Sequence, residues 1–132
     1  MAGWKILADC LKPGGLMKLG LYSELARKHI VKIRQEISKA CIGSSDAAIK
    51  SLRKMVMTSN EDHYTLITTS SDFYSMSNLK DLLFHVQEHR FTIPQIQECL
   101  SQLGLNFCGF EPAKTVTHFK KKNTGVDDTY DL

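Results

Sequence analysis

The stretch that decides the fold runs from Asp72 to Glu111 and reads DFYSMSNLKDLLFHVQEHRFTIPQIQECLSQLGLNFCGFE. Its second half carries the signals of one helix. Thr92 is a helix-capping residue type, a proline falls in the first helical turn, and Gly104 follows the apolar stripe. The apolar residues 106–110 then predict a strand. A helix, a turn and a strand in this order are typical of α/β domains.

A second apolar stretch lies near the start of the chain. Residues 16–22 are almost continuously apolar, are bounded by the turn sequence KPGG at 12–15, and are too short for a typical helix. This is how a strand buried on both faces of a parallel sheet reads. A short helix over residues 4–11 is expected before the turn.

The rest of the chain is mostly helical in pattern. Ser23 is a plausible N-cap for a helix to about Cys41, and the serines before residue 46 cap a second helix. Residues 58–71 read mostly as a loop with a weak strand at 65–68, and Ser77 is expected to cap a short helix. A last short helix is expected after Pro112, through residue 119.

The pattern therefore predicts an α/β fold with five or six helices and about two or three strands. Two strands do not form a stable sheet alone. We expect the rest of the sheet to come from a missing N-terminal half of the domain or from a second copy in a homo-oligomer. The domain is expected to cover residues 1–119, with a flexible tail over 120–132.

Composition restricts the class of protein. The net charge of +3 is too small to favour nucleic acid as a partner, because an acidic tail offsets the basic run at 120–122. No apolar run reaches the roughly 18 residues that a membrane helix needs, so no membrane partner is expected. The first residues lack the pattern of a secretory leader, which predicts a cytoplasmic location.

Residues His85 to His89 match H-x-x-E-H, which in some zinc proteases places two histidines one helical turn apart with a glutamate as base. Arg90 and the proline at 94 would end such a helix at once, so zinc hydrolysis is kept only as a minor alternative. The sequence has no C-x-x-C pair and no G-x-G-x-x-G loop, so we assign no metal ligands and no cofactor-binding residues.

Two long segments resemble one known family. Residues 14–27 (GGLMKLGLYSELAR) and 81–92 (DLLFHVQEHRFT), with Asp72–Ser75, are similar to the C-terminal part of class I S-adenosylmethionine-dependent methyltransferases, in the bacterial group often fused to tetratricopeptide repeats. The resemblance covers most of residues 3–111. It implies a partial Rossmann-like methyltransferase fold, with S-adenosylmethionine as cofactor of the complete enzyme.

The same resemblance, with the position of residues 22–24 after a strand, indicates a substrate side. Its candidate residues are Tyr22, Ser23, Glu24, His85, Glu88, His89 and Arg90. The glycine-rich cofactor loop is absent from this sequence, so the chain alone is expected neither to bind the cofactor tightly nor to turn over. The alternative is a non-catalytic interaction or dimerisation module.

Overall fold

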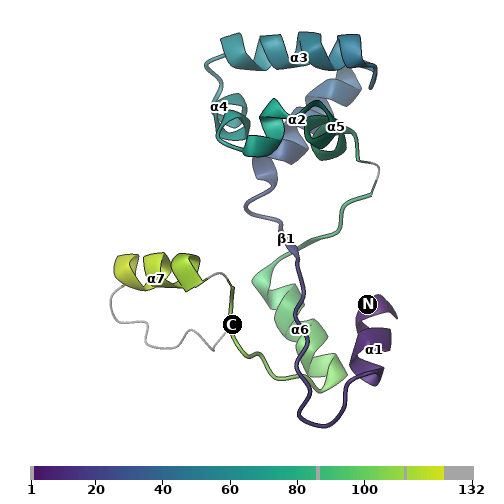
Figure 1. Ribbon diagram of the computed structural model, residues 1–132, viewed down its shortest axis with the longest axis vertical. Coiled ribbons are helices and arrows are strands. Elements are labelled where there is room, and N and C mark those ends of the chain that lie inside the picture. The colour runs from purple at the N-terminus through teal and green to yellow at the C-terminus, as the bar shows by residue number, and fades with distance from the viewer. Residues whose placement is uncertain (1, 86, 112, 124–132) are drawn as a thin grey trace. The chain divides into compact units, whose positions relative to one another are not determined.

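Figure 1 shows a computed structural model of the 132-residue chain, which describes residues 2–85, 87–111 and 113–123. Within those ranges the regular structure consists of seven α-helices, one 3-10 helix and two short strands. The chain divides into two compact units. We call residues 21–90 the helical unit, and residues 1–20 with 91–132 the terminal unit.

The helical unit is a small bundle. Its elements are α2 (Lys28–Lys39), α3 (Asp46–Thr58), α4 (Asp62–Thr68), η1 (Ser71–Tyr74) and α5 (Met76–Phe84). Helices α2 and α3 each pack against α4 and α5, and η1 packs against α4 and α5 (Figure 1). The core is made of buried aliphatic side chains and one phenylalanine: Ile30, Ile33, Ile37, Ile49, Leu52, Val56, Ile67, Phe73, Leu79, Leu82 and Leu83.

Sequence periodicity explains this bundle. The isoleucines of α2 recur three and four residues apart, so they form one stripe that faces the core. Ser45 caps α3, and its hydroxyl accepts the amide proton of Ala48 at 3.3 Å. Ser75, rather than the expected Ser77, caps α5 in the same way. The stripe and the two caps together fix where these helices begin and which face they bury.

The end of α2 is a tight left-handed turn. Cys41 adopts a positive φ of 52°, while the amides of Cys41 and Ile42 donate to the carbonyls of Ser38 and Ile37. This is the Schellman arrangement, in which glycine is the usual left-handed residue. Ile42 packs against the core just beyond the turn, which anchors the chain reversal into α3.

The terminal unit contains α1 (Ala2–Asp9), α6 (Ile93–Leu103) and α7 (Ala113–Lys122). As predicted, Thr92 caps α6, and its reciprocal hydrogen bonds with Gln95 form a capping box. Gly104 ends α6 in the left-handed conformation, also as predicted. Among the described residues of this unit, only Cys99 is buried. The described part of the terminal unit therefore has a well-capped α6 but buries only one side chain.

The two predicted strands are largely wrong. Residues 16–21 and 106–110 form no regular structure, and the observed strands are β1 (Tyr22–Ser23) and β2 (Arg90–Phe91), which pair as a two-stranded parallel sheet. An apolar strand needs paired neighbours on both sides. Leu16 finds none in the described part of the chain and is 82% exposed.

Other local predictions also need correction. Residues 65–68 belong to α4 instead of a strand, because His63 and Ile67 bury one helical face. Ser23 caps only a turn, since α2 begins five residues later. Of the expected tail, residues 120–122 belong to α7, and residues 124–132 lie outside the described residues.

In the described part of the chain, no helix has the length and apolar character required to cross a bilayer. The observed architecture is helix-rich with one small sheet, which agrees with the α/β expectation only at that level.

Candidate functional site

A pocket of about 520 Å³ opens in the helical unit. That volume lies in the range of small-molecule sites. Its lining combines two arginines, three acids, a histidine and small polar groups from β1, α2, η1, α5 and the segment after α5. The lining residues are Tyr22, Arg27, Arg34, Asp72, Ser77, Asn78, Asp81, Leu82, His85 and Glu88.

Glu88 is the centre of the arginine side of the pocket. Its side chain is only 3% exposed, and its Oε2 accepts a hydrogen bond from Nη2 of Arg34 at 3.1 Å. Arg34 also donates from Nε and Nη2 to the carbonyl of Leu82, at 3.0 and 2.6 Å. Arg34 thus ties the end of α5 and the segment that follows it to α2. Because a charged donor meets a charged acceptor, the contact with Glu88 is stronger than a neutral hydrogen bond.

Two further arginines approach the other oxygen of Glu88. Nε of Arg27 lies 3.9 Å and Nη1 of Arg90 lies 3.7 Å from Oε1. The Arg27 guanidinium lies over the ring of Tyr22, 4.1 Å from its centroid, which is cation–π geometry. Arg90 donates from Nε to Glu24 at 3.0 Å. The Tyr22–Glu24 segment and the Glu88–Arg90 segment are therefore joined through side chains as well as through the β1–β2 pair.

The Oε1 atom of Glu88 has no hydrogen-bond partner among the residues that the structure describes. Both arginine distances exceed hydrogen-bond length, so the attraction there is between charges only. Three guanidiniums around one buried carboxylate leave this side of the pocket positive, even with Glu24 beside Arg90.

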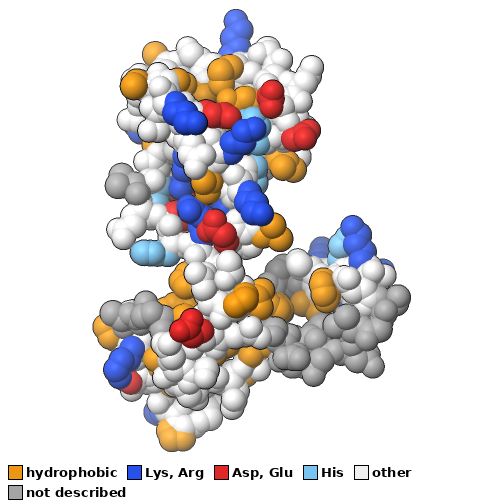
Figure 2. Space-filling model, turned by 180° about the vertical axis from the view of Figure 1, so that it is seen from behind, with side chains coloured by type: hydrophobic (Ala, Val, Ile, Leu, Met, Phe, Trp, Pro, Cys, Tyr) orange, Lys and Arg blue, Asp and Glu red, His pale blue; other side chains and the backbone are white. Residues whose placement is uncertain are grey.

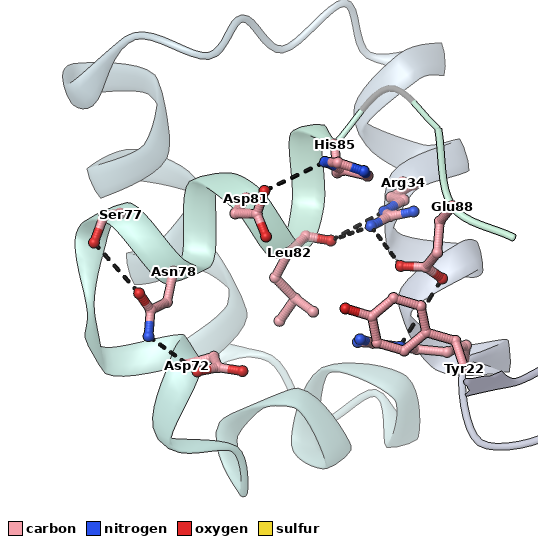
Figure 3. A pocket seen from close by; sticks show the side chains of 10 residues that line it. Tyr22, Arg34, Asp72, Ser77, Asn78, Asp81, Leu82, His85 and Glu88 are labelled. Atoms are coloured by element: carbon pink, nitrogen blue, oxygen red, sulfur yellow. Dashed lines mark hydrogen bonds and ion pairs between the residues drawn. The ribbon is translucent and has the colours of Figure 1, made fainter. Parts of the chain in front are cut away.

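The other side of the pocket is acidic. Figure 3 shows Ser77, Asn78 and Asp72 facing Arg34, Glu88 and Tyr22 across the pocket. Asp72 Oδ1 accepts from the amide of Asn78 at 3.1 Å, and Ser77 donates to Asn78 Oδ1 at 3.4 Å.

Asp81 and His85 lie between these two sides in the view of Figure 3, with Nδ1 of His85 3.3 Å from Oδ1 of Asp81. In the described part of the chain, no lysine or arginine forms an ion pair with Asp72 or Asp81. Asp72 and Asp81 are therefore open to a cationic partner, apart from the contact of Asp81 with His85.

The structure distributes the seven candidate residues as follows. Tyr22, His85 and Glu88 line the pocket, while Glu24 and Arg90 form the adjoining ion pair. Ser23 instead accepts the amide proton of Ala26 at 3.2 Å. His89 is exposed and lies beside Gln87, with 3.4 Å between their Nε2 atoms. Neither Ser23 nor His89 lines the pocket.

The sequence analysis did not select two arginines that line the pocket. Arg27, which directly precedes α2, and Arg34 within α2 have side chains that are only 20% and 18% exposed. A signal was present, because residues seven apart share one face of a helix and both follow the isoleucine stripe closely.

The H-x-x-E-H segment does not form the helical turn on which a zinc site would depend. Helix α5 ends at Phe84, His85 has extended backbone angles, and the chain reaches β2 at Arg90. Among the described residues, no group of three or more His, Cys, Asp or Glu side chains is placed to hold a metal ion. The carboxylate of Glu88 is directed to arginines instead.

A second polar cluster joins α2 to α4 around His63, which is 7% exposed. Lys32 Nζ lies 3.1 Å from His63 Nδ1, and His63 Nε2 lies 3.0 Å from Glu36 Oε2. An ammonium can only donate, so Nδ1 accepts and the proton is on Nε2, directed at Glu36. Tyr64 donates to the same Glu36 oxygen at 2.7 Å.

This cluster shifts the titration of its members. Burial raises the pKa of Tyr64, and the adjacent Glu36 carboxylate raises it further, to about 12. Burial alone would raise the pKa of Glu36, but hydrogen bonds from Tyr64 and His63 outweigh it and hold that pKa below its ordinary value. Desolvation lowers the pKa of the nearby His29. The polar groups of this cluster hydrogen-bond to one another and link α2 to α4, so we assign the cluster a structural role.

No family model matches the sequence, and no solved structure is significantly similar to this chain.

Proposed function

We propose that the chain is the C-terminal part of a class I S-adenosylmethionine-dependent methyltransferase domain of Rossmann-like fold, with residues 21–90 as a helical insert on the substrate side. The sequence segments 14–27 and 81–92 support this through their resemblance to that family. The observation that carries the proposal is the pairing of Tyr22–Glu24 with Glu88–Arg90 beside one pocket.

In the complete enzyme, the pocket would hold the molecule that receives the methyl group. S-adenosylmethionine supplies an electrophilic methyl group, and transfer by in-line displacement depends mainly on how the acceptor is positioned. Tyr22 and Arg27 present an aromatic face and a cation, while Asp72 and Asn78 present carboxylate and amide groups. These side chains would orient a polar acceptor by hydrogen bonds from both sides.

The chain alone is not expected to bind the cofactor. Phosphate- and nucleotide-binding folds hold the cofactor with a glycine-rich turn at a helix N-terminus, and this sequence has no such turn. We expect calorimetric titration of the full chain with S-adenosylmethionine to give no micromolar binding. A micromolar dissociation constant would contradict this part of the proposal.

The lineage itself is tested by the genomic DNA upstream of the first codon. An in-frame region that encodes a glycine-rich strand–loop–helix is expected there. In-frame stop codons directly upstream would contradict the proposal that the chain continues into a cofactor-binding half.

The second candidate is a non-catalytic interaction module, and the terminal unit favours it. Large apolar side chains are exposed on this unit, and orange side chains are prominent in the lower part of Figure 2. They are Ile6, Leu7, Leu16, Ile93, Phe110 and Phe119. A partner surface, either the N-terminal half of a domain or a second copy, would cover them. Sedimentation velocity should then show a dimer, and a sharp monomer across a wide concentration range would exclude self-pairing.

A further inference from the structure

The pocket of the helical unit has two unlike sides, and this determines the chemistry of its ligand. On one side, Arg27, Arg34 and Arg90 surround the single buried carboxylate of Glu88. Even with Glu24 paired to Arg90, this side keeps an excess positive charge. On the other side, the carboxylate of Asp72 accepts a hydrogen bond from the neutral side-chain amide of Asn78 and has no cationic partner among the described residues.

Arg27 is the cation available to a ligand on the positive side. Its guanidinium is held over the Tyr22 ring and donates no hydrogen bond to a described residue, whereas Arg34 donates three hydrogen bonds, two to the carbonyl of Leu82 and one to Glu88. A guanidinium has five N–H donors in a fixed fork that matches a carboxylate. The side chain is one-fifth exposed, so a small anion can reach it without displacing the core.

Asp72 and Asp81 offer the complementary group. Both line the pocket, and neither is paired with a lysine or arginine within the described ranges. A ligand ammonium near Asp72 would make charge-assisted hydrogen bonds that the neutral Asn78 amide cannot replace. An ammonium at Glu88 would instead be repelled by three guanidiniums.

A third observation concerns the unpaired oxygen of Glu88, on the positive side of the pocket. Glu88 Oε1 is buried in a side chain that is 97% covered, lines the pocket, and accepts no hydrogen bond from a described residue. A buried acceptor left unpaired is costly, by about 1–3 kcal/mol. Because this atom has almost no accessible surface, the carboxylate would have to turn slightly toward the pocket before an amide N–H or a hydroxyl of a ligand could satisfy it, without adding positive charge.

We propose that this pocket binds a small zwitterion, with its anionic group at Arg27, its ammonium at Asp72, and a neutral N–H or O–H donor directed at Glu88. A short peptide or amino-acid-like molecule is the simplest ligand of this class. The inference rests on the proposed function only in naming this ligand as the methyl acceptor. The ligand class itself follows from the pocket alone.

Four probes of similar length separate the three contacts. Glycylglycine carries both charges and an amide, 5-aminopentanoate carries both charges without the amide, and pentylamine and pentanoate carry one charge each. Each is titrated into the ¹⁵N-labelled full chain, and amide shifts are followed by NMR. We expect glycylglycine to bind at least about tenfold more tightly than either single-charge probe, and more tightly than 5-aminopentanoate.

The shifts should concentrate at residues 22–27, 72–78 and 88. Asp72→Asn should weaken glycylglycine binding about tenfold and leave pentanoate binding unchanged. Asp62→Asn, which removes an exposed acid of α4 outside the pocket lining, is the matched control and should change neither.

Equal affinity of a single-charge probe and glycylglycine would overturn the proposal, as would the absence of pocket shifts at about 10 mM probe. If Asp72→Asn fails to fold, the four-probe comparison on the unchanged chain still decides. No S-adenosylmethionine is present in this experiment. Its failure therefore removes the ligand class alone, while failure of the upstream-sequence test removes the methyltransferase proposal alone.

Discussion

The helical unit and the terminal unit differ in what stabilises their helices. Helix α6 of the terminal unit has a capping box at Thr92 and a left-handed glycine at its end, whereas Arg27, at the N-cap position of α2, makes no side-chain cap hydrogen bond. Yet α2 buries three isoleucines in a closed core, and α6 buries only Cys99. Helix-end signals thus determine where a helix forms, while the partners of its apolar face determine how firmly it is held.

The largest expected contrast is between two phenylalanines. Phe73 is fully buried in the core of the helical unit, so Phe73→Ala should lower the free energy of unfolding by about 3–5 kcal/mol. Phe107 of the terminal unit touches Phe110 with 4.8 Å between ring centroids and stays partly exposed. Phe107→Ala should cost less than about 1 kcal/mol. Urea unfolding followed by circular dichroism measures both, and equal losses would contradict the division into a closed and an open unit.

Next in size is the buried carboxylate at the pocket. Glu88→Gln removes the charge around which Arg27, Arg34 and Arg90 gather, so it should cost about 2–4 kcal/mol. Glu24→Gln breaks only the half-exposed pair with Arg90 and should cost about 0–1 kcal/mol. Both variants are compared by urea unfolding. If Glu88→Gln leaves the free energy of unfolding unchanged, the Glu88 charge does not stabilise the arrangement of the three arginines.

A pair of cap substitutions sharpens the contrast at smaller scale. Ser45→Ala removes the cap of α3 and should lower the unfolding free energy of the helical unit by about 1 kcal/mol. Thr92→Ala removes an equally well-formed cap from α6, but it should leave the main unfolding transition unchanged and only reduce helical signal. If Thr92→Ala shifts the main transition as much as Ser45→Ala does, then α6 belongs to the same cooperative unit.

A further effect, seen mainly at alkaline pH, concerns Tyr64. Its pKa is raised from 10.0 to about 12, so the folded state retains the phenol proton more strongly than the unfolded state. The resulting stability is complete below pH 10 and is lost as pH rises through about 12. Tyr64→Phe, which loses the hydrogen bond to Glu36, should cost about 0.5–1.5 kcal/mol at neutral pH and abolish this alkaline loss. Absorbance at 295 nm checks the assignment, because the phenol signal that titrates last should disappear in Tyr64→Phe.

Local patterns predicted helices in both units. The isoleucine stripe of α2, the serine cap of α3 and the Thr92–Gly104 limits of α6 were all readable, because each depends on residues within one or two turns. The strands at 16–22 and 106–110 were not, since a strand exists only through distant partners. An apolar run indicates that burial of the segment would be favourable. The residues of the run do not indicate whether another strand is present to pair with it.

Only part of the candidate site could be predicted, because some of its residues are brought together by contacts between distant parts of the sequence. Tyr22 and Glu88 were selected from the segments at 22–24 and 85–90, and the structure brings those segments together. Arg27, Arg34 and Asp72 were missed because their roles depend on charges far away in the sequence. A buried carboxylate needs cations nearby, but the burial of Glu88 became visible only in the structure.

Native-state hydrogen exchange on the full chain tests most directly whether only the helical unit holds a closed core. Amides of α2, α3 and α5 should exchange only through unfolding of that unit, while amides of α1 and α6 should exchange by local opening at far lower free energy. If the amides of α6 are protected from exchange as strongly as those of α3, and dilution of the protein does not change this, then the terminal unit also holds a closed core and the account is contradicted.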